Sequence, residues 1–138
     1  MPKTTATART ATETVDAYLQ QLHDAALGTT ELLHPEVRWD ATVPHWRYRL
    51  DGEEAVRKEL AHWYSTPLTE GRAIRRAIEG GEVVDLSQRF TEGGVEWTVH
   101  HLMILEVDDG LVRSITIACG GRWDPELVAQ MDPAAHAG

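Results

Sequence analysis

The stretch that decides the fold is "VEWTVHHLMILEV", Val95–Val107. Its odd-numbered positions are apolar except for His101, whereas its even-numbered positions carry polar or charged residues beside Leu102 and Ile104. Because successive side chains of a strand point to opposite faces of the sheet, this alternation predicts a long strand whose odd face lies against a core. The ring of His101 is then expected in the interior. The simpler alternative is a core histidine that is hydrogen-bonded to one carbonyl.

Three further segments near this strand have the composition of β-structure. They are 72–79, 82–90 and 111–119, and the short sequences "GG", "EGG" and "DDG" separate neighbouring strands. Turns rich in glycine and aspartate are typical of hairpin connections. The second half of the chain is therefore expected to form an antiparallel meander that curls into a long sheet.

Helical patterns precede this sheet. Apolar residues recur at three- and four-residue spacing in the first of them, and Asp51 and Asp124 can cap the two later helices. In chain order, the expected elements are a helix over 14–27, a helical turn over 29–34, extended segments over 36–43 and 45–50, a helix over 51–65 and a short terminal helix over 123–131. Helices followed by a long sheet are typical of an α+β layer architecture.

Composition excludes several classes of partner. The chain has 138 residues and a formal net charge of −9, and its 13 Lys and Arg residues are scattered. Because nucleic-acid binding depends on basic residues that neutralise phosphates, this charge argues against a nucleic acid and against an anionic membrane surface. No apolar stretch approaches the ~20 residues of a membrane span. The single cysteine, Cys119, cannot form an internal disulfide, and we expect a cytoplasmic protein.

The ends of the chain differ in composition from its middle. The opening "MPKTTATARTATE" is rich in Thr and Ala and has no apolar stretch of the kind that a secretory signal needs. We expect a disordered arm over 1–12, one α+β domain over 13–132 and a flexible tail over 133–138.

Several phrases of the sequence occur in a familiar order. They are "DAYLQQLHDAAL" (16–27), "LLHPEVRWDATVP" (32–44), "LDGEEAVRKELAHWY" (50–64) and "HHLMILEVDDGLVRSITIACGGRWDPELVAQM" (100–131). In this order they resemble the nuclear transport factor 2-like superfamily, in particular its SnoaL-like polyketide cyclase branch. The resemblance implies a cystatin-like fold, in which N-terminal helices pack on a strongly curved antiparallel sheet. That sheet would form a cone with an internal apolar pocket.

The same resemblance implies a site inside the pocket. Members similar to this chain, such as ketosteroid isomerase and the polyketide cyclases, place acid and base groups in a dry cavity, where burial raises the pKa of a carboxyl. Tyr18 lies where the isomerase has a hydroxyl donor, Asp40 lies in the strand that supplies its base, and His101 lies close to the position of its protonated acid. These three residues are the expected catalytic groups. For Tyr18 a core tyrosine bonded to a carbonyl is an equal alternative.

Two arguments orient Asp40 differently. The alternation of Val37, Trp39 and Ala41 turns Asp40 to the opposite face of its strand. Counting back from Pro44, by analogy with the epoxide hydrolases of the superfamily, turns it into the pocket, which requires a β-bulge or a twisted strand end. Only the second orientation allows an Asp40–His101 pair.

Large apolar side chains are the expected walls of the pocket. Those expected to bind a substrate are Trp39, Trp46, Trp63, Trp97, Met103 and Ile117. The epoxide hydrolase pattern needs an Arg and two Asp where this chain has Gln88, Phe90 and Ile117, so epoxide hydrolysis of that type is disfavoured. Adjacent His100 and His101 point to opposite faces and cannot share a metal. Neither a metal nor a cofactor is expected.

Two hypotheses about function follow. The first is a cofactor-independent enzyme of the isomerase, cyclase or dehydratase type, which acts on a small hydrophobic, cyclic or polyketide-like molecule. The second is a non-catalytic ligand-binding or dimerisation module of the same fold, since fold does not fix function. In both cases the half-apolar even face of the 95–107 strand is expected to join two copies in a homodimer.

Overall fold

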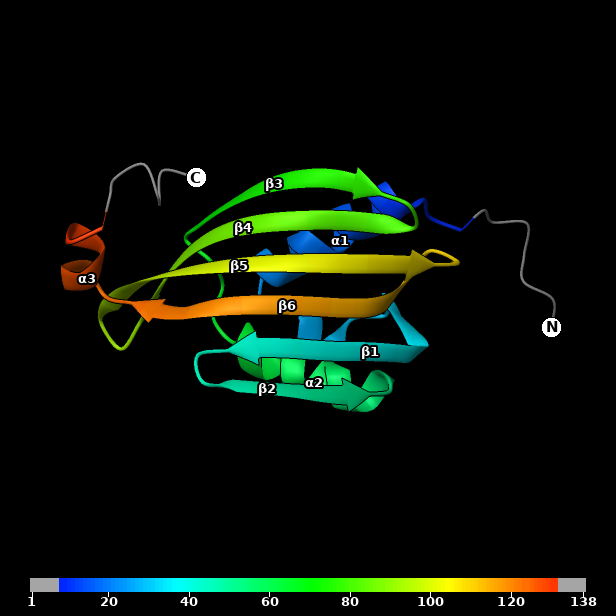
Figure 1. Ribbon diagram of the computed structural model, residues 1–138, viewed down its shortest axis with the longest axis horizontal. Coiled ribbons are helices and arrows are strands. Elements are labelled where there is room, and N and C mark those ends of the chain that lie inside the picture. Colours follow the sequence, from blue (N-terminus) through cyan, green and yellow to red (C-terminus); the bar gives the residue numbers. More distant parts are fainter. Residues whose placement is uncertain (1–7, 132–138) are drawn as a thin grey trace.

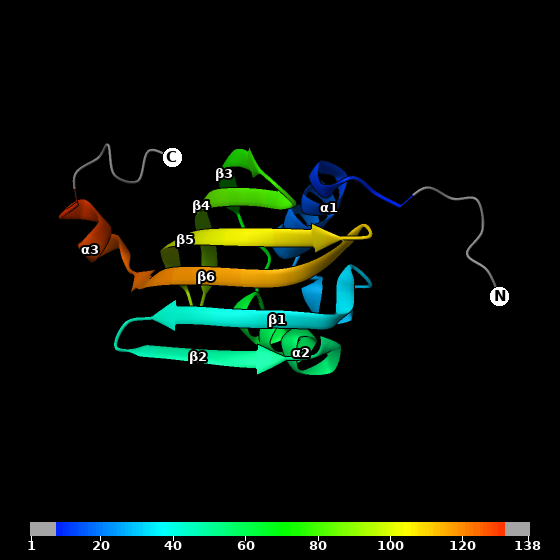
Figure 2. The ribbon, with the colours of Figure 1, turned by 45° about the vertical axis from the view of Figure 1, so that its right-hand side comes forward.

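Six strands form one curved, open sheet in residues 8–131, the part of the chain that this computed structural model describes (Figures 1 and 2). In the order of the sheet they are β2 (Trp46–Asp51), β1 (Leu33–Val43), β6 (Leu111–Trp123), β5 (Val95–Asp108), β4 (Gly81–Glu92) and β3 (Glu70–Ile78). The helices pack on one face, so the α+β architecture is confirmed.

The strand pairing differs from the expected antiparallel sheet at one place. Among the described strands β3 to β6 pair as an antiparallel meander, and β1 and β2 form an antiparallel hairpin. However, β1 runs parallel to β6, with Trp39 opposite Ile115, so the sheet is mixed. The expectation was wrong here because the sequence shows which segments are strands but not how a hairpin formed early in the chain docks on the last strand.

Helices α1 (Ala11–His23) and α2 (Glu53–Trp63) lie behind the sheet in Figure 1, α1 behind β4 and β5 and α2 behind β1 and β2, while α3 (Pro125–Ala129) extends beyond the end of β6. The Asp124 side chain caps α3 as expected, by accepting from the amide of Leu127. The N-cap of α2 is Gly52 rather than the expected Asp51, and its φ of 96° suits glycine.

Two further local expectations need correction. The helical turn expected over 29–34 is instead the 3₁₀ turn η1 (Leu27–Thr29), after which β1 starts. Helix α1 begins at Ala11, inside the segment expected as an arm; residues 1–7 of that arm and the tail 133–138 lie outside the described residues. The start of α1 is fixed by a capping box, in which Thr10 and Glu13 bond each other's backbone amides.

The alternation of β5 separates the core from the outer face. Of its odd-numbered residues, Met103 and Leu105 are almost fully buried and His101 is 4% exposed. Its even-numbered residues Leu102 and Ile104 are exposed on the other face. The interior position of His101 is therefore confirmed, and the core lies between this face and the two helices.

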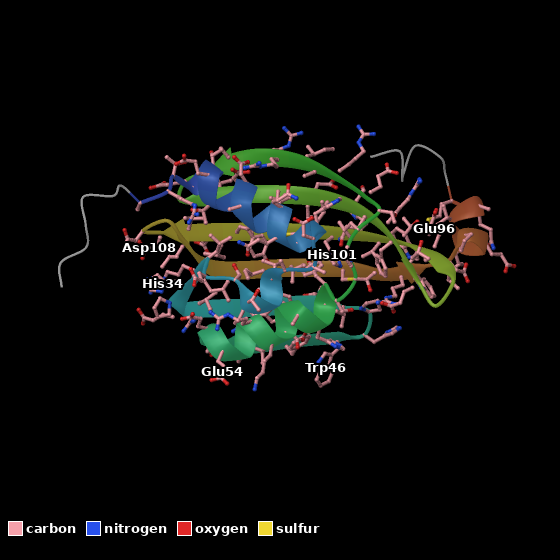
Figure 3. All side chains as sticks on the ribbon, turned by 180° about the vertical axis from the view of Figure 1, so that it is seen from behind. His34, Trp46, Glu54, Glu96, His101 and Asp108 are labelled. Atoms are coloured by element: carbon pink, nitrogen blue, oxygen red, sulfur yellow. The ribbon has the colours of Figure 1, made fainter. Side chains whose placement is uncertain are left out.

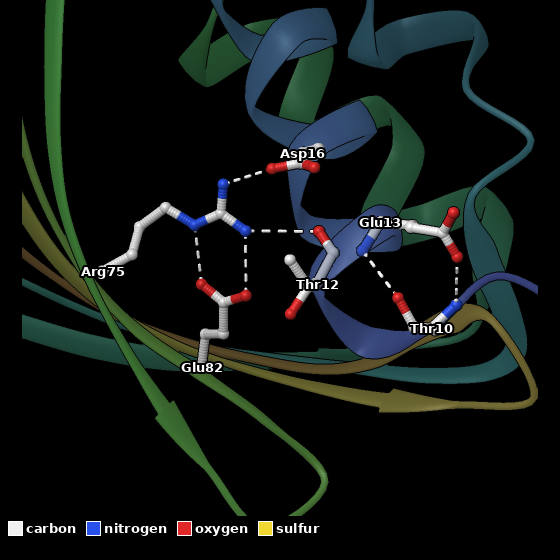
Figure 4. Close-up of polar contacts among 6 residues, drawn as sticks. All are labelled: Thr10, Thr12, Glu13, Asp16, Arg75 and Glu82. Carbon is white, nitrogen blue, oxygen red and sulfur yellow. Dashed lines mark hydrogen bonds and ion pairs between the residues drawn. The ribbon is translucent and has the colours of Figure 1, made fainter.

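An ionic cluster fastens α1 to the edge of the sheet (Figure 4). The guanidinium of Arg75 on β3 binds both oxygens of Glu82 on β4, at 2.7 and 2.8 Å. It also pairs with Asp16 and donates to the carbonyl of Thr12 at 3.2 Å, both on α1. Because every group in this cluster has an opposite charge or a donor facing it, the nearly buried Glu82 is fully compensated.

No helix in residues 8–131 is long and apolar enough to cross a membrane. The expected cytoplasmic location stays a prediction.

Candidate functional site

A cavity of about 440 Å³ lies between α2 and the ends of strands β1, β2, β4, β5 and β6. Its lining is mixed, with aromatic and aliphatic walls that carry several polar groups. The lining residues are Val43, Tyr48, Glu59, His62, Trp63, Ser65, Gln88, Phe90, Glu92, Val99, His101, Cys119 and Arg122. A concave, partly apolar space with a few convergent polar groups is typical of a small-molecule site.

His101 is held at one of its ring nitrogens. The Tyr64 hydroxyl lies 2.9 Å from Nδ1, and the amide nitrogen of Gln88 lies 2.8 Å from the same atom. Because an amide nitrogen only donates, Nδ1 must be the acceptor, and the ring proton therefore resides on Nε2. Figure 3 shows His101 in the interior, between the helices and the sheet.

Burial keeps this imidazole uncharged. Desolvation, with a smaller contribution from His100, lowers the pKa of His101 to about 3. Burial also raises the pKa of the Tyr64 hydroxyl well above its ordinary value. At neutral pH His101 is thus a neutral donor whose Nε2–H is available to a ligand in the cavity, and it cannot act there as a base.

A second polar cluster surrounds Glu59 of α2. The Tyr48 hydroxyl donates a short hydrogen bond to Glu59 Oε2, and the indole nitrogen of Trp63 lies 3.3 Å from the same oxygen. That indole also donates to the Tyr48 oxygen at 3.0 Å. Among the described residues, Oε1 of Glu59 accepts no hydrogen bond and no cation pairs with the carboxylate. Glu59 therefore offers a free carboxylate oxygen in a half-buried setting.

The indole of Trp63 connects the two clusters. Its ring centroid lies 5.3 Å from that of His101, and its nitrogen bonds the Glu59–Tyr48 pair. Buried Trp39 packs against it in an edge-to-face contact with a centroid distance of 5.0 Å. The neutral donor and the carboxylate therefore both contact the same aromatic side chain.

The helical spacing of α2 explains how Glu59 reaches the cavity. Val56 and Leu60 are fully buried. Glu59 lies three residues after Val56 and four residues before Trp63. Residues at these spacings share a helix face. Glu59 is thus at the margin of the buried stripe, close enough to the core to enter the cavity.

At the rim of the cavity, Arg122 of β6 is fixed from several sides. Its guanidinium lies 5.0 Å from the centroid of Phe90 and 5.6 Å from that of Trp97. Its Nη1 donates to Glu92 at 2.9 Å, and the Thr66 hydroxyl donates to the other oxygen of Glu92 at 2.8 Å. The hydrogen bond from Arg122 lowers the pKa of Glu92, which therefore stays ionised.

The structure places Asp40 away from this cavity. Its carboxylate is bound by Arg47 at 2.7 and 3.0 Å and lies 3.3 Å from Arg49, on the face of the sheet opposite to buried Trp39. The hydrogen bond from Arg47 lowers the pKa of Asp40. The expected Asp40–His101 pair is therefore wrong, because the register of β1 opposite β2 and β6 is regular from Arg38 to Thr42 and contains no bulge that could turn Asp40 inward.

The remaining expected residues fall in three environments. Trp63 and His101 line the cavity. Tyr18, Trp39, Met103 and Ile117 are buried in the core beneath it and do not line it. Trp97 lies under Arg122 at the rim, and Trp46, 67% exposed, lies at the hairpin end of β2 (Figure 3). Tyr64, rather than Tyr18, supplies the hydroxyl next to His101.

Sequence reasoning missed Glu59, Tyr48, Tyr64 and Gln88 as site residues. A signal existed for Gln88, which interrupts the apolar row Val84, Leu86, Phe90 as His101 interrupts that of β5. The spacing of Glu59 from its buried neighbours was a signal too. Tyr48 and Tyr64 gave none, since aromatic residues at such positions are usually core.

Metal ligation has no visible basis in residues 8–131, where no group of three or more His, Cys, Asp or Glu side chains is arranged to hold an ion. Cys119 also lines the cavity, but burial raises the pKa of its thiol.

Comparison with known proteins supports the fold. No protein-family model matches the chain, and no curated protein matches it significantly. A candidate isomerase from Bacillus subtilis superposes with a TM-score of 0.65 at 14% identity, covering 87% of this chain and 90% of its own. An LEH-like epoxide hydrolase from M. tuberculosis superposes with a TM-score of 0.62 at 16% identity, covering 79% of this chain and 81% of its own. A Xanthomonas campestris protein of unknown function with a cystatin-like fold superposes with a TM-score of 0.60 at 13% identity, covering 88% of this chain and 95% of its own.

At these identities the likeness establishes the fold alone. The chain has a cystatin-like fold, as the resemblance implied. The SnoaL-like branch and the substrate remain matters for proposal.

Proposed function

We propose that the protein is a small-molecule enzyme that transfers a proton on an uncharged cyclic carbonyl compound, as an isomerase, cyclase or dehydratase of the SnoaL-like type would. One observation carries the proposal: a neutral His101 N–H and the free oxygen of Glu59 line the same cavity, and both residues contact Trp63. A fixed donor paired with a carboxylate is the minimum that proton abstraction next to a carbonyl needs.

The chemistry assigned to each residue follows from the donor or acceptor atom that it presents to the cavity. Glu59 Oε1 would remove the proton from the carbon next to the carbonyl, and the electron pair of that C–H bond would move to the carbonyl oxygen. The Nε2–H of His101 would donate a hydrogen bond to the resulting oxyanion. Returning the proton from Glu59 to another carbon of the same compound completes an isomerisation, with no net change in protons.

Tyr64, Gln88 and Tyr48 would support these two groups. The first two hold His101 Nδ1 as an acceptor, which keeps the proton on Nε2. The Tyr48 hydroxyl orients the Glu59 carboxylate. Gln88 is thus engaged with His101, and Ile117 is in the core, so the arrangement favours proton transfer over epoxide opening.

Deuterium exchange provides a direct test. 2-Tetralone is flat, uncharged and has exchangeable protons beside its carbonyl, so its exchange in D₂O can be followed by proton NMR. We expect the wild-type protein to accelerate exchange, and Glu59→Gln or His101→Gln to lower the rate about a hundredfold. Glu96→Gln is the matched control, because Glu96 is an exposed carboxylate on β5 outside the cavity (Figure 3).

The outcomes separate the two hypotheses about function. Tight binding of 2-tetralone without any acceleration of exchange would support a non-catalytic ligand-binding module. Acceleration that survives both substitutions would reject the assignment of Glu59 and His101.

We also propose that the outer face of the sheet joins two copies of the chain. Leu102 and Ile104 of β5 are 47% and 39% exposed on that face. Their partners on the neighbouring strand β6 are Ala118 and Thr116. Sedimentation velocity of the wild type should show a dimer, and Leu102→Glu should shift it to a monomer. A monomeric wild type at micromolar concentration would reject this arrangement.

A further inference from the structure

Arg122 is the one Lys or Arg side chain among the cavity-lining residues. A cation at the rim of a site ordinarily attracts carboxylates, because charge-assisted hydrogen bonds to Arg are strong. Here, however, Nη1 of Arg122 is already bonded to Glu92, and its Cζ atom lies over the rings of Phe90 and Trp97.

Glu92 is itself anchored. It accepts from Thr66 at 2.8 Å, a residue of the loop between α2 and β3. The carboxylate therefore bridges that loop and the end of β6 through two hydrogen bonds. With side chains 44% and 42% exposed, the two ions neutralise one another at the rim while remaining accessible to water.

The second carboxylate of the cavity has no such partner. The hydrogen bonds to Glu59 come from the neutral groups of Tyr48 and Trp63, and none of the described cations pairs with it. An anion entering the cavity would thus meet an uncompensated negative charge in a setting of reduced dielectric, where like charges repel strongly.

We propose that the site selects uncharged ligands against carboxylates, and that Glu92 is the specificity-determining residue because it occupies Arg122. This inference rests on the proposed function only in taking the cavity as the ligand site. It does not depend on Glu59 being the base. It predicts that removing the charge of Glu92 frees Arg122 to bind an anion at the rim.

The test compares two probes of nearly equal shape, 2-naphthamide and 2-naphthoate, by isothermal titration calorimetry at pH 7.5. The amide offers a carbonyl acceptor to His101, whereas the carboxylate adds a negative charge. For the wild type we expect the amide to bind at least about tenfold more tightly. For Glu92→Gln we expect the ratio to fall about fivefold, through tighter binding of the carboxylate.

Matched variants isolate the cause. Glu96→Gln removes the same charge from β5 without touching Arg122, so the ratio should stay at the wild-type value. In the double variant Glu92→Gln with Arg122→Gln, the gain in carboxylate affinity should disappear, because the freed cation is gone.

Other outcomes of the binding measurements overturn the inference. Equal binding of the two probes to the wild type would show that the site does not select by charge. An unchanged ratio in Glu92→Gln, or an equal change in Glu96→Gln, would remove the role of Glu92. If neither probe binds, the cavity is not the ligand site, and both the proposed function and the inference fail. If the amide binds but exchange of 2-tetralone is not accelerated, only the catalytic proposal fails.

Discussion

Two polar clusters of this molecule are built on opposite principles. In the cluster of Arg75, Glu82 and Asp16, every charge faces an opposite charge, and the cluster ties α1 to the sheet edge. In the cavity, Glu59 is bonded only by neutral groups, and His101 is held at one nitrogen while the other is left to the cavity. The first arrangement satisfies its groups within the protein, whereas the second leaves two groups for a ligand.

The largest expected effect concerns the first cluster. Replacing Arg75 by Met leaves nearly buried Glu82 without its cation, and we expect the free energy of unfolding to fall by about 3 kcal/mol. Urea denaturation would measure the loss. Arg113→Met is the control, because Arg113 pairs with Asp108 at the surface and should contribute less than about 1 kcal/mol. Equal losses in the two variants would mean that the Arg75 cluster does not fasten α1.

The second expected effect is a pH dependence that arises in the cavity. The pKa of His101 is about 3 in the folded protein, below its value of ~6.5 in the unfolded chain. As the pH falls from ~6.5 toward 3, His101 takes up a proton in the unfolded chain but not in the folded protein. Its contribution to stability, complete above pH ~6.5, is therefore lost as the pH falls toward 3, by up to about 1.4 kcal/mol per unit.

His101→Gln lacks this dependence and isolates it from the titration of carboxylates. Between pH 6.5 and 5, we expect urea denaturation to show about 2 kcal/mol more loss of stability in the wild type than in the variant. Parallel curves for the wild type and His101→Gln would show that His101 titrates as an exposed histidine does.

A smaller effect should follow from loosening His101 without removing it. Tyr64→Phe deletes one of the two donors to Nδ1, so the Nε2–H tautomer is less strongly favoured. We expect exchange of 2-tetralone to slow about tenfold, equivalent to about 1.4 kcal/mol in the barrier. The imidazole ¹⁵N shifts should move as well, which a purely structural role would not cause. Unchanged shifts with a slower rate would assign Tyr64 to packing.

The smallest effect is expected at Asp40, the residue expected from the sequence to be the catalytic base. A variant at this position distinguishes that expectation from the assignment of Glu59 as the base. Asp40→Asn removes one partner of an ion pair on the outer face, and we expect stability to change by less than about 1 kcal/mol. Exchange of 2-tetralone should be within twofold of the wild-type rate, by a rough estimate for a group outside the cavity. A hundredfold loss would return the base to Asp40.

The fold could be predicted from the sequence because its signals are periodic. The alternation in Val95–Val107 and the glycine turns on either side define β5 and its neighbours to within a few residues. Periodicity also decided the orientation of Asp40 correctly, while the analogy with relatives did not. The parallel pairing of β1 with β6 was beyond reach, because no local pattern records which strand lies next to which.

The candidate site could be predicted only where a polar residue interrupts an apolar row. His101 met that condition, and so did Gln88. Glu59 lies at the margin of a helical stripe, where charged residues are ordinarily solvated, so its position became visible only with the packing of α2 on the sheet. Trp46 shows the opposite error. The sequence predicted that this aromatic side chain would line the pocket, whereas it is exposed to solvent.

The parallel docking of β1 on β6 has a consequence for how the molecule assembles. The β1–β2 hairpin is complete at Asp51, yet its partner strand β6 begins only at Leu111, after β3, β4 and β5 have been synthesised. Because β6 also brings Cys119 and Arg122 to the cavity, the centre of the sheet and one wall of the pocket are completed by the same late event. Nascent chains that lack β6 should therefore expose the apolar face of the unpaired β1–β2 hairpin to chaperones.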